Sequence, residues 1–128
     1  MTINFFEPGD VPQPPDNVKI ELLEVEPYPD KWRVKLRVHV TPFLQRPNLE
    51  IILWREVGGE ERPIANLSII ETMHPRMEFT MHIRGVSDPV GDYRVSANLY
   101  YRDEMKEGED EPPPPVQKDA RELNLTIS

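Results

Sequence analysis

The residue types that most often carry out catalysis do not form a working set in this sequence. Its three histidines, His39, His74 and His82, are accompanied by no cysteine and by no Gly-x-Ser-x-Gly elbow that would present a nucleophilic serine. The glycine pair Gly58-Gly59 stands beside two glutamates and lacks the spacing of a phosphate-binding loop. We therefore expect a protein that is not an enzyme and that carries no cofactor.

Two of the histidines, His39 and His82, fall in segments that alternate like β-strands, and both face away from the expected core. If these strands are antiparallel neighbours in a suitable register, the two imidazoles would face each other at a spacing that accepts a metal. A pH-sensitive pair is the second interpretation of the same placement. The third is a solvated face, which we favour because no further metal ligand is apparent. Its charged neighbours are Arg37, Glu78 and Arg84.

The segment from Asp103 to Lys118 is the best candidate for a binding surface. A connection of this length between paired strands is unusual and is typical of either a functional or a disordered loop. Its acids would attract a basic partner and its prolines would present a stiff docking segment; the alternative is a solvated loop without function. Calcium is not favoured, because the spacing of the acids matches no EF-hand. The candidate partner-binding residues are Asp103, Glu104, Glu107, Glu109, Asp110, Glu111, Pro112, Pro113, Pro114 and Pro115.

The elements that must position these residues are predicted to be strands. Between residues 31 and 40, Trp32 and four aliphatic residues alternate with charged or polar ones, and this period of two recurs along the chain. No stretch shows a helical period with caps, so we predict an all-β fold, a two-sheet antiparallel β-sandwich of about seven strands. The predicted strands cover residues 18–25, 31–40, 49–57, 64–70, 77–84, 93–101 and 121–127.

The segment Asp88-Pro-Val-Gly-Asp-Tyr-Arg-Val-Ser-Ala-Asn-Leu-Tyr-Tyr101 resembles a loop and the following strand of fibronectin type III and other immunoglobulin-like domains. The resemblance implies a tyrosine corner, in which the ring of Tyr93 packs inward and its hydroxyl bonds a backbone group a few residues upstream. It also implies a buried tryptophan between the sheets, for which Trp54 and Trp32 compete. Because there is no cysteine to join the sheets, we expect Tyr93, Trp32, Trp54 and Val38 to anchor the core.

The charge of the chain narrows the classes of partner. Its net charge is −8, with seven acids and one lysine in residues 1–30 and eight acids and three bases in residues 103–128. An acidic protein repels nucleic acid and anionic membranes, so we expect neither as a partner. Residues 31–102 have eleven bases and eight acids. The alternative function is therefore ligand or ion binding, through the acidic loop of residues 103–111 or through a basic face. That face comprises Arg33, Lys35 and Arg37.

Clustered prolines mark residues 1–17 as an N-terminal tail or arm and leave residues 18–128 as a single sandwich domain. Phe5 and Phe6 in this arm would dock on their own domain, or pair with the strand edge of a second copy to form a homodimer. No apolar run is long enough to cross a bilayer and the N-terminus is unlike a signal peptide, so we expect a cytoplasmic protein. The expected function is a non-catalytic protein-interaction or scaffold module with an unidentified protein partner.

Overall fold

The computed structural model describes residues 6–128, and nearly all of their regular structure is β-strand. Every predicted strand is present, with shifts at the ends. The strands are β1 (Ile20–Pro27), β2 (Arg33–Val40), β3 (Asn48–Val57), β4 (Glu60–Ile69), β5 (Arg76–His82), β6 (Gly91–Tyr101) and β7 (Val116–Ile127). One short 3-10 turn, η1 (Pro15–Asn17), precedes β1.

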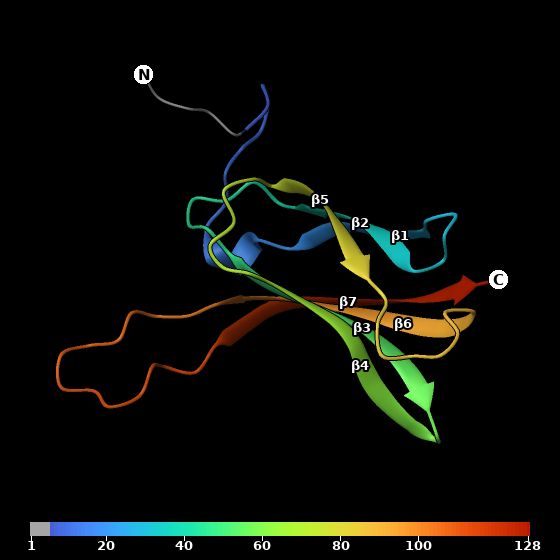
Figure 1. The fold of residues 1–128 in the computed structure, drawn as a ribbon. Coiled ribbons are helices and arrows are strands. Elements are labelled where there is room, and N and C mark those ends of the chain that lie inside the picture. The colour runs from blue at the N-terminus through green and yellow to red at the C-terminus, as the bar shows by residue number, and fades with distance from the viewer. Residues whose placement is uncertain (1–5) are drawn as a thin grey trace.

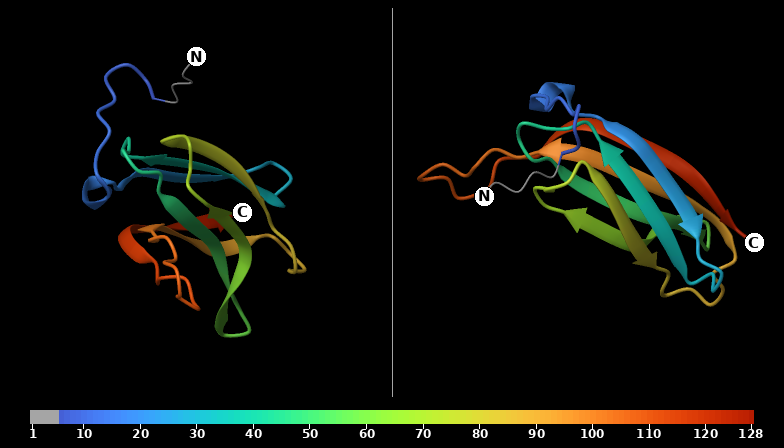
Figure 2. Two further views of the ribbon diagram at one scale, coloured as in Figure 1. Left: turned by 90° about the vertical axis from the view of Figure 1, so that its left-hand side faces the viewer. Right: turned by 90° about the horizontal axis from the view of Figure 1, so that it is seen from above.

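The strands form two antiparallel sheets that lie one above the other (Figure 1). One sheet has the order β1-β2-β5, and the other has the order β4-β3-β6-β7. The left view of Figure 2 shows the two layers from one end of the sandwich. The predicted all-β sandwich with seven strands is therefore confirmed.

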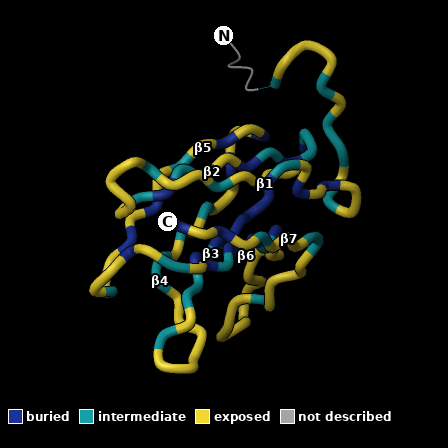
Figure 3. The backbone as a smooth tube through the Cα atoms, turned by 90° about the vertical axis from the view of Figure 1, so that its right-hand side faces the viewer, coloured by how far each residue is buried: buried dark blue, intermediate teal, exposed yellow. Residues whose placement is uncertain are grey.

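The core lies between the two sheets and follows the alternation of the sequence. In β2, Val34, Leu36 and Val38 are fully buried, whereas Lys35 and Arg37 lie on the outer face. Figure 3 shows that the buried positions lie mainly along the strands, whereas the loops are mostly exposed. Each aliphatic side chain buried in this way stabilises the fold by roughly 1.5–3 kcal/mol, so the core joins the sheets without a disulfide.

The strand ends differ most from the prediction around the acidic loop. β7 begins at Val116, five residues before the predicted start, because Val116 pairs with Tyr101 and Gln117 pairs with Tyr100. The connection between β6 and β7 therefore comprises residues 102–115. It is shorter than the predicted loop of residues 103–118 because its last residues join the sheet.

The turn into β6 is the predicted tyrosine corner. Tyr93 is 3 % exposed, and its hydroxyl donates a hydrogen bond to the carbonyl of Pro89 at 2.6 Å. Arg55 reaches across from β3 and donates to the carbonyl of Val90 at 2.7 Å. Gly91 has a φ of 146°, and a Cβ at this position would lie 2.9 Å from the Arg55 guanidinium. Glycine therefore fits position 91, whereas any other residue would be strained there.

The predicted core role of the two tryptophans is wrong. Trp32 immediately precedes β2 and is 41 % exposed. Trp54 lies on the outer face of β3, where its indole N–H donates to the hydroxyl of Ser96 at 2.8 Å. The guanidinium carbon of Arg94 lies 5.1 Å from the Trp54 ring centroid. Trp54 is thus half-buried by polar neighbours outside the core.

The two long sides of the sandwich are closed to different degrees. On one side β1 meets β7: the Asp119 carboxylate accepts a hydrogen bond from the N–H of Ile20 at 2.8 Å, and the Lys19 ammonium donates to the carbonyl of Lys118 at 3.0 Å. On the other side, β4 and β5 are edge strands, and within residues 6–128 β4 pairs only with β3 and β5 pairs only with β2. A groove lies on this second side.

Candidate functional site

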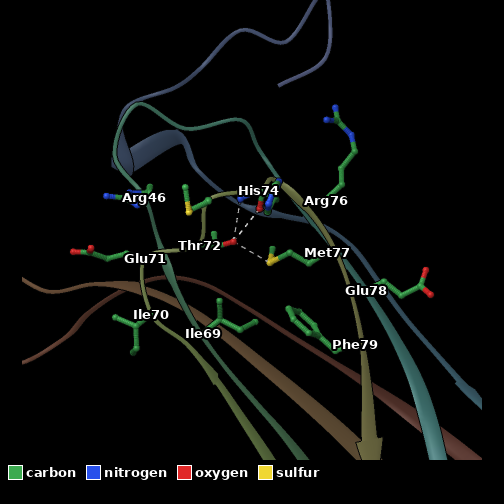
Figure 4. Close-up of a pocket in the computed structure, with 11 residues that line it drawn as sticks. Arg46, Ile69, Ile70, Glu71, Thr72, His74, Arg76, Met77, Glu78 and Phe79 are labelled. Atoms are coloured by element: carbon green, nitrogen blue, oxygen red, sulfur yellow. Dashed lines mark hydrogen bonds between the residues drawn. The ribbon is translucent and has the colours of Figure 1, made fainter. Parts of the chain in front are cut away.

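The groove between β4 and β5 is a cavity of about 620 Å³. Ile69 from β4 and Met77 and Phe79 from β5 give it an apolar base, which Figure 4 shows below the loop of residues 70–75. Two apolar side chains of that loop, Ile70 and Met73, also line the groove. They stay in contact with water, since Ile70 is 67 % exposed and Met73 is 48 % exposed. Neighbouring apolar side chains that stay in contact with water are typical of a surface that binds a partner.

The loop that forms the wall of the groove is held in place by hydrogen bonds. Asn48 is buried; its side-chain oxygen accepts from the N–H of Glu71 at 2.8 Å, and its amide donates to the carbonyl of Tyr100 at 3.3 Å. The Thr72 N–H donates to the carbonyl of Pro47 at 3.0 Å. Glu71 has a φ of 49°, a left-handed conformation that costs a non-glycine residue about 1 kcal/mol or more. The wall is therefore preformed rather than loose.

Strand β5 offers backbone groups next to the groove. The Ile83 N–H bonds the Trp32 carbonyl, and the Val40 N–H bonds the Pro75 carbonyl, both at 2.8 Å. In an antiparallel pair, hydrogen-bonded and non-bonded residue pairs alternate, and these two bonds fix the phase for all of β5. Every second residue of β5 therefore points its N–H and C=O away from β2, toward the open edge. These residues are Arg76, Glu78, Thr80 and His82.

The N-terminal segment is attached beside the start of β5. The Arg76 guanidinium donates to both carboxylate oxygens of Asp10, at 2.8 and 3.1 Å, and this hydrogen bond lowers the pKa of Asp10 below its usual value. Phe6 packs edge-on against Phe43 with ring centroids 5.5 Å apart. Docking of the arm on its own domain is thus confirmed for Phe6, whereas Phe5 lies outside the described residues.

The acidic loop extends away from the sandwich as a long exposed hairpin (Figure 1). A turn closes its tip, where the Glu109 N–H donates to the carbonyl of Lys106 at 3.1 Å and Gly108 has a φ of 88°. Among the residues that the structure describes, no ion pair involves its six acids. All six acids and three of its four consecutive prolines are exposed, and Pro113 is half-buried. The acids are Asp103, Glu104, Glu107, Glu109, Asp110 and Glu111, and the exposed prolines are Pro112, Pro114 and Pro115.

The histidine pair does not form. His39 and His82 lie in neighbouring strands as predicted, but His39 is opposite Arg76 and His82 is opposite Arg33, at the two ends of the β2–β5 pair. The alternation of a strand gives the face of a residue and not its register, so this separation was outside what the pattern could predict. Within residues 6–128 there is no group of three or more acids or histidines that could hold a metal.

The basic face on β2 is largely neutralised by acids. Lys35 lies 3.2 Å from Glu78, and Arg37 lies 3.2 Å from Glu24. Arg33 is paired with Asp30, which lies 2.9 Å away. This arrangement leaves little net positive charge to hold an anionic ligand, and it favours neutralisation within the fold.

The groove was missed by the sequence reasoning. Apart from Arg46, its residues come from one stretch between residues 69 and 79, which comprises a strand end, a loop and the next strand. Nothing in the pattern of that stretch tells which side of a sandwich stays open. The one available signal is that Ile70 is an apolar residue at the last position of the predicted strand of residues 64–70, and that Met73 is an apolar residue in the connection that follows it.

Comparison with protein-family models, with curated proteins and with solved structures gives no match for this chain. None of the helices within residues 6–128 has the length and apolar character required to span a bilayer. The site must therefore be interpreted from its own geometry.

Proposed function

We propose that this protein is a non-catalytic protein-interaction module that binds an extended segment of a partner along the open edge of β5. The observation that carries the proposal is the free edge of β5 beside an apolar groove with a preformed wall. A strand added at this edge would bond the outward N–H and C=O groups of Glu78 and Thr80. Because side chains of a strand alternate, every second residue of the partner would enter the groove.

The base of the groove sets the chemistry of those side chains. Phe79 and Ile69 are half-buried and Met77 is buried beside them, and together they would form the apolar surface that covers apolar groups of the partner. Methionine suits this role because its flexible thioether adapts to different shapes. We therefore expect a partner segment that alternates apolar residues with polar ones and contains no proline at the paired positions.

The immunoglobulin-like identity of the fold is part of the same proposal. It is supported by the hydrogen bond from Tyr93 to Pro89 and by the division of the strands into sheets of three and four. An interaction role is common among such sandwiches, but a fold alone does not define function. The groove, not the fold, carries the functional proposal.

The acidic loop is a second surface through which the domain would contact a partner. It is exposed, and no described residue forms an ion pair with its acids, so the charges of residues 103–111 are available to a basic protein. The acidic loop has no apolar base of the kind that lines the groove. The edge of β5, in contrast, has backbone groups that can form directional hydrogen bonds with an added strand. The groove is therefore the preferred site for strand binding.

Selection from a displayed library of short random peptides tests the proposal. We expect enriched peptides to alternate apolar and polar residues and to lose binding to the double variant Ile70→Ser, Met73→Ser. They should also lose binding to Thr80→Pro, which removes an outward N–H without removing a bond to β2. Leu44→Ser is the matched control, because Leu44 is 71 % exposed but does not line the groove.

Circular dichroism shows whether each variant keeps the fold. Enriched peptides that bind the folded groove variants as well as they bind the Leu44→Ser protein would place the binding surface elsewhere. Absence of any enriched peptide would contradict the strand-addition proposal itself.

A further inference from the structure

A second cavity, of about 400 Å³, lies on the outer face of the four-stranded sheet where the acidic loop leaves it. It is separate from the groove and draws on three strands of the sheet and both ends of the loop. Its lining residues are Glu50 from β3, Asn98 and Tyr100 from β6, Gln117 from β7, and Arg102 and Pro115 from the loop.

Glu50 is a fixed carboxylate at one side of this cavity. One of its oxygens accepts from the side-chain amide of Asn66 at 2.7 Å, and the other accepts from the hydroxyl of Ser68 at 2.5 Å. Ser68 lies directly opposite Glu50 in the register, and Asn66 is the next residue on the same face of β4. Both donors are neutral, so they orient the carboxylate without cancelling its charge.

No cation within residues 6–128 forms an ion pair with Glu50. Other acids on the sheets have such a partner: Glu61 pairs with Arg94, and Glu78 pairs with Lys35. Glu50 is also half-buried, so its charge is screened less by solvent than that of a fully exposed acid. The cavity therefore contains a preoriented negative charge that is left for a ligand.

The other lining groups fit a cationic side chain better than a free metal ion. Tyr100 supplies an aromatic ring, whose face attracts a guanidinium or ammonium group. Asn98 and Gln117 supply amide oxygens that can accept hydrogen bonds from such a group. One carboxylate and two amides give too little charge for a tight divalent site.

Arg102 is the one lining group that opposes a cation. It is exposed, it lies at the edge of the cavity where β6 has ended, and the next two residues are Asp103 and Glu104. Those acids, with the rest of the loop, make the surroundings negative and favour the approach of a basic partner. Glu50 is held in place by two hydrogen bonds and is half-buried, whereas Arg102 is exposed to solvent, so we expect the charge of Glu50 to dominate inside the cavity.

We propose that this cavity binds an arginine side chain of a basic protein partner, with the guanidinium on Glu50 and the planar group against Tyr100. Arginine is favoured over lysine because a planar fork can bond a fixed carboxylate with two parallel N–H groups and stack on a ring. The proposal does not depend on strand binding in the β5 groove.

The test is a titration, followed by NMR chemical shifts of the backbone amides, with a short glycine peptide that has a single central arginine. We expect saturable shifts at residues 50, 98, 100 and 117, and none from the same peptide with citrulline, which has the shape of arginine without its charge. Glu50→Gln should weaken binding about tenfold or more, because it removes a charge-assisted bond and keeps the shape. Glu56→Gln is the matched control, since Glu56 is an exposed acid of the same strand outside the cavity.

Arg102→Gln gives a second and opposite expectation. Removing the positive charge at the rim should leave arginine binding unchanged or strengthen it. Equal binding of citrulline and arginine, unchanged binding to Glu50→Gln, or loss of binding in Arg102→Gln would each overturn the proposal. Binding of a glutamate peptide that depends on Arg102 would assign the cavity to an anionic ligand instead.

Discussion

The side-chain oxygen of Asn48 accepts a hydrogen bond from the backbone N–H of Glu71 at 2.8 Å, and this contact ties the wall of the groove to the start of β3. Asn48→Ala removes it together with the bond to the Tyr100 carbonyl. We expect the free energy of unfolding to fall by about 2 kcal/mol, because buried groups lose their partners. Urea denaturation measures the change. Asn98→Ala is the control and should lower the free energy of unfolding by less than about 0.5 kcal/mol. Equal losses in the two variants would show that the hydrogen bonds of Asn48 do not stabilise the fold.

The hydroxyl of Tyr93 closes the corner before β6. Tyr93→Phe removes the bond to the Pro89 carbonyl and keeps the buried ring, so it should lower the free energy of unfolding by about 1 kcal/mol. Tyr100→Phe provides the comparison, because Tyr100 is a half-buried tyrosine of the same strand outside the corner. Chemical denaturation of both variants measures their free energies of unfolding. A corner that contributes nothing would leave the two variants equally stable.

Tyr101 makes the fold sensitive to alkaline pH. Burial raises the pKa of Tyr101 to about 12, from an ordinary value of 10.0. The stability contributed by its protonated form is complete below about pH 10 and is lost as the pH rises toward about 12, because the unfolded chain ionises first. We therefore expect unfolding measurements above about pH 10 to show a smaller loss of stability in Tyr101→Phe than in the wild type. Parallel pH profiles would mean that Tyr101 ionises as easily in the folded protein as in the unfolded chain.

Acid should release the N-terminal segment from β5. The hydrogen bond from Arg76 lowers the pKa of Asp10 below 3.8, so the stability that this pair contributes is present above that pH and is lost as the pH falls through the lower folded-state pKa. NMR shifts of Phe6 and Phe43 would report the detachment. In Asp10→Asn the contact should be weak already at neutral pH and insensitive to acid. Asp103→Asn should behave as the wild type does.

The acidic loop should be dispensable for folding. Replacing residues 103–114 by a short Asn-Gly turn removes almost no buried surface. A shorter connection has a smaller entropy cost of closure, so the free energy of unfolding should stay constant or rise by up to about 1 kcal/mol. Thermal and urea unfolding provide the measurement. A large loss of stability would mean that the loop packs on the domain.

The sequence predicts the strands well because alternation is a local property. Residues of β2 and β6 alternate between core and solvent as their spacing requires, and the Tyr93 segment carries its corner in a few consecutive residues. The predicted core positions of the two tryptophans are wrong for different reasons. Trp32 has the parity of the core residues but precedes the strand, whereas Trp54 was assigned by resemblance although its own strand points Leu49 and Leu53 inward and therefore turns it outward.

The binding surfaces depend on relations that a single strand cannot encode. The register separates His39 from His82, and the same kind of relation brings Glu50 beside Ser68 and Asn98. Asp119 and Lys19 close one side of the sandwich through contacts between β1 and β7, whereas the opposite side has the groove. Pairing partners and closed sides are decided by the packing of whole sheets, which the pattern of one segment does not report.

The edge of β5 also limits how far an assembly built on it can grow. If the added strand came from a second copy of this chain, β5 would pair with β5 about a twofold axis, and each copy would contribute the same surface. In such a contact the β5 edges of both copies are paired, so no β5 edge is left to add a third molecule. At the edge of the other sheet, β4 carries Pro63, which cannot donate a ladder bond and discourages a further strand there. On this side of the sandwich, self-pairing would thus produce a closed pair and not a fibre.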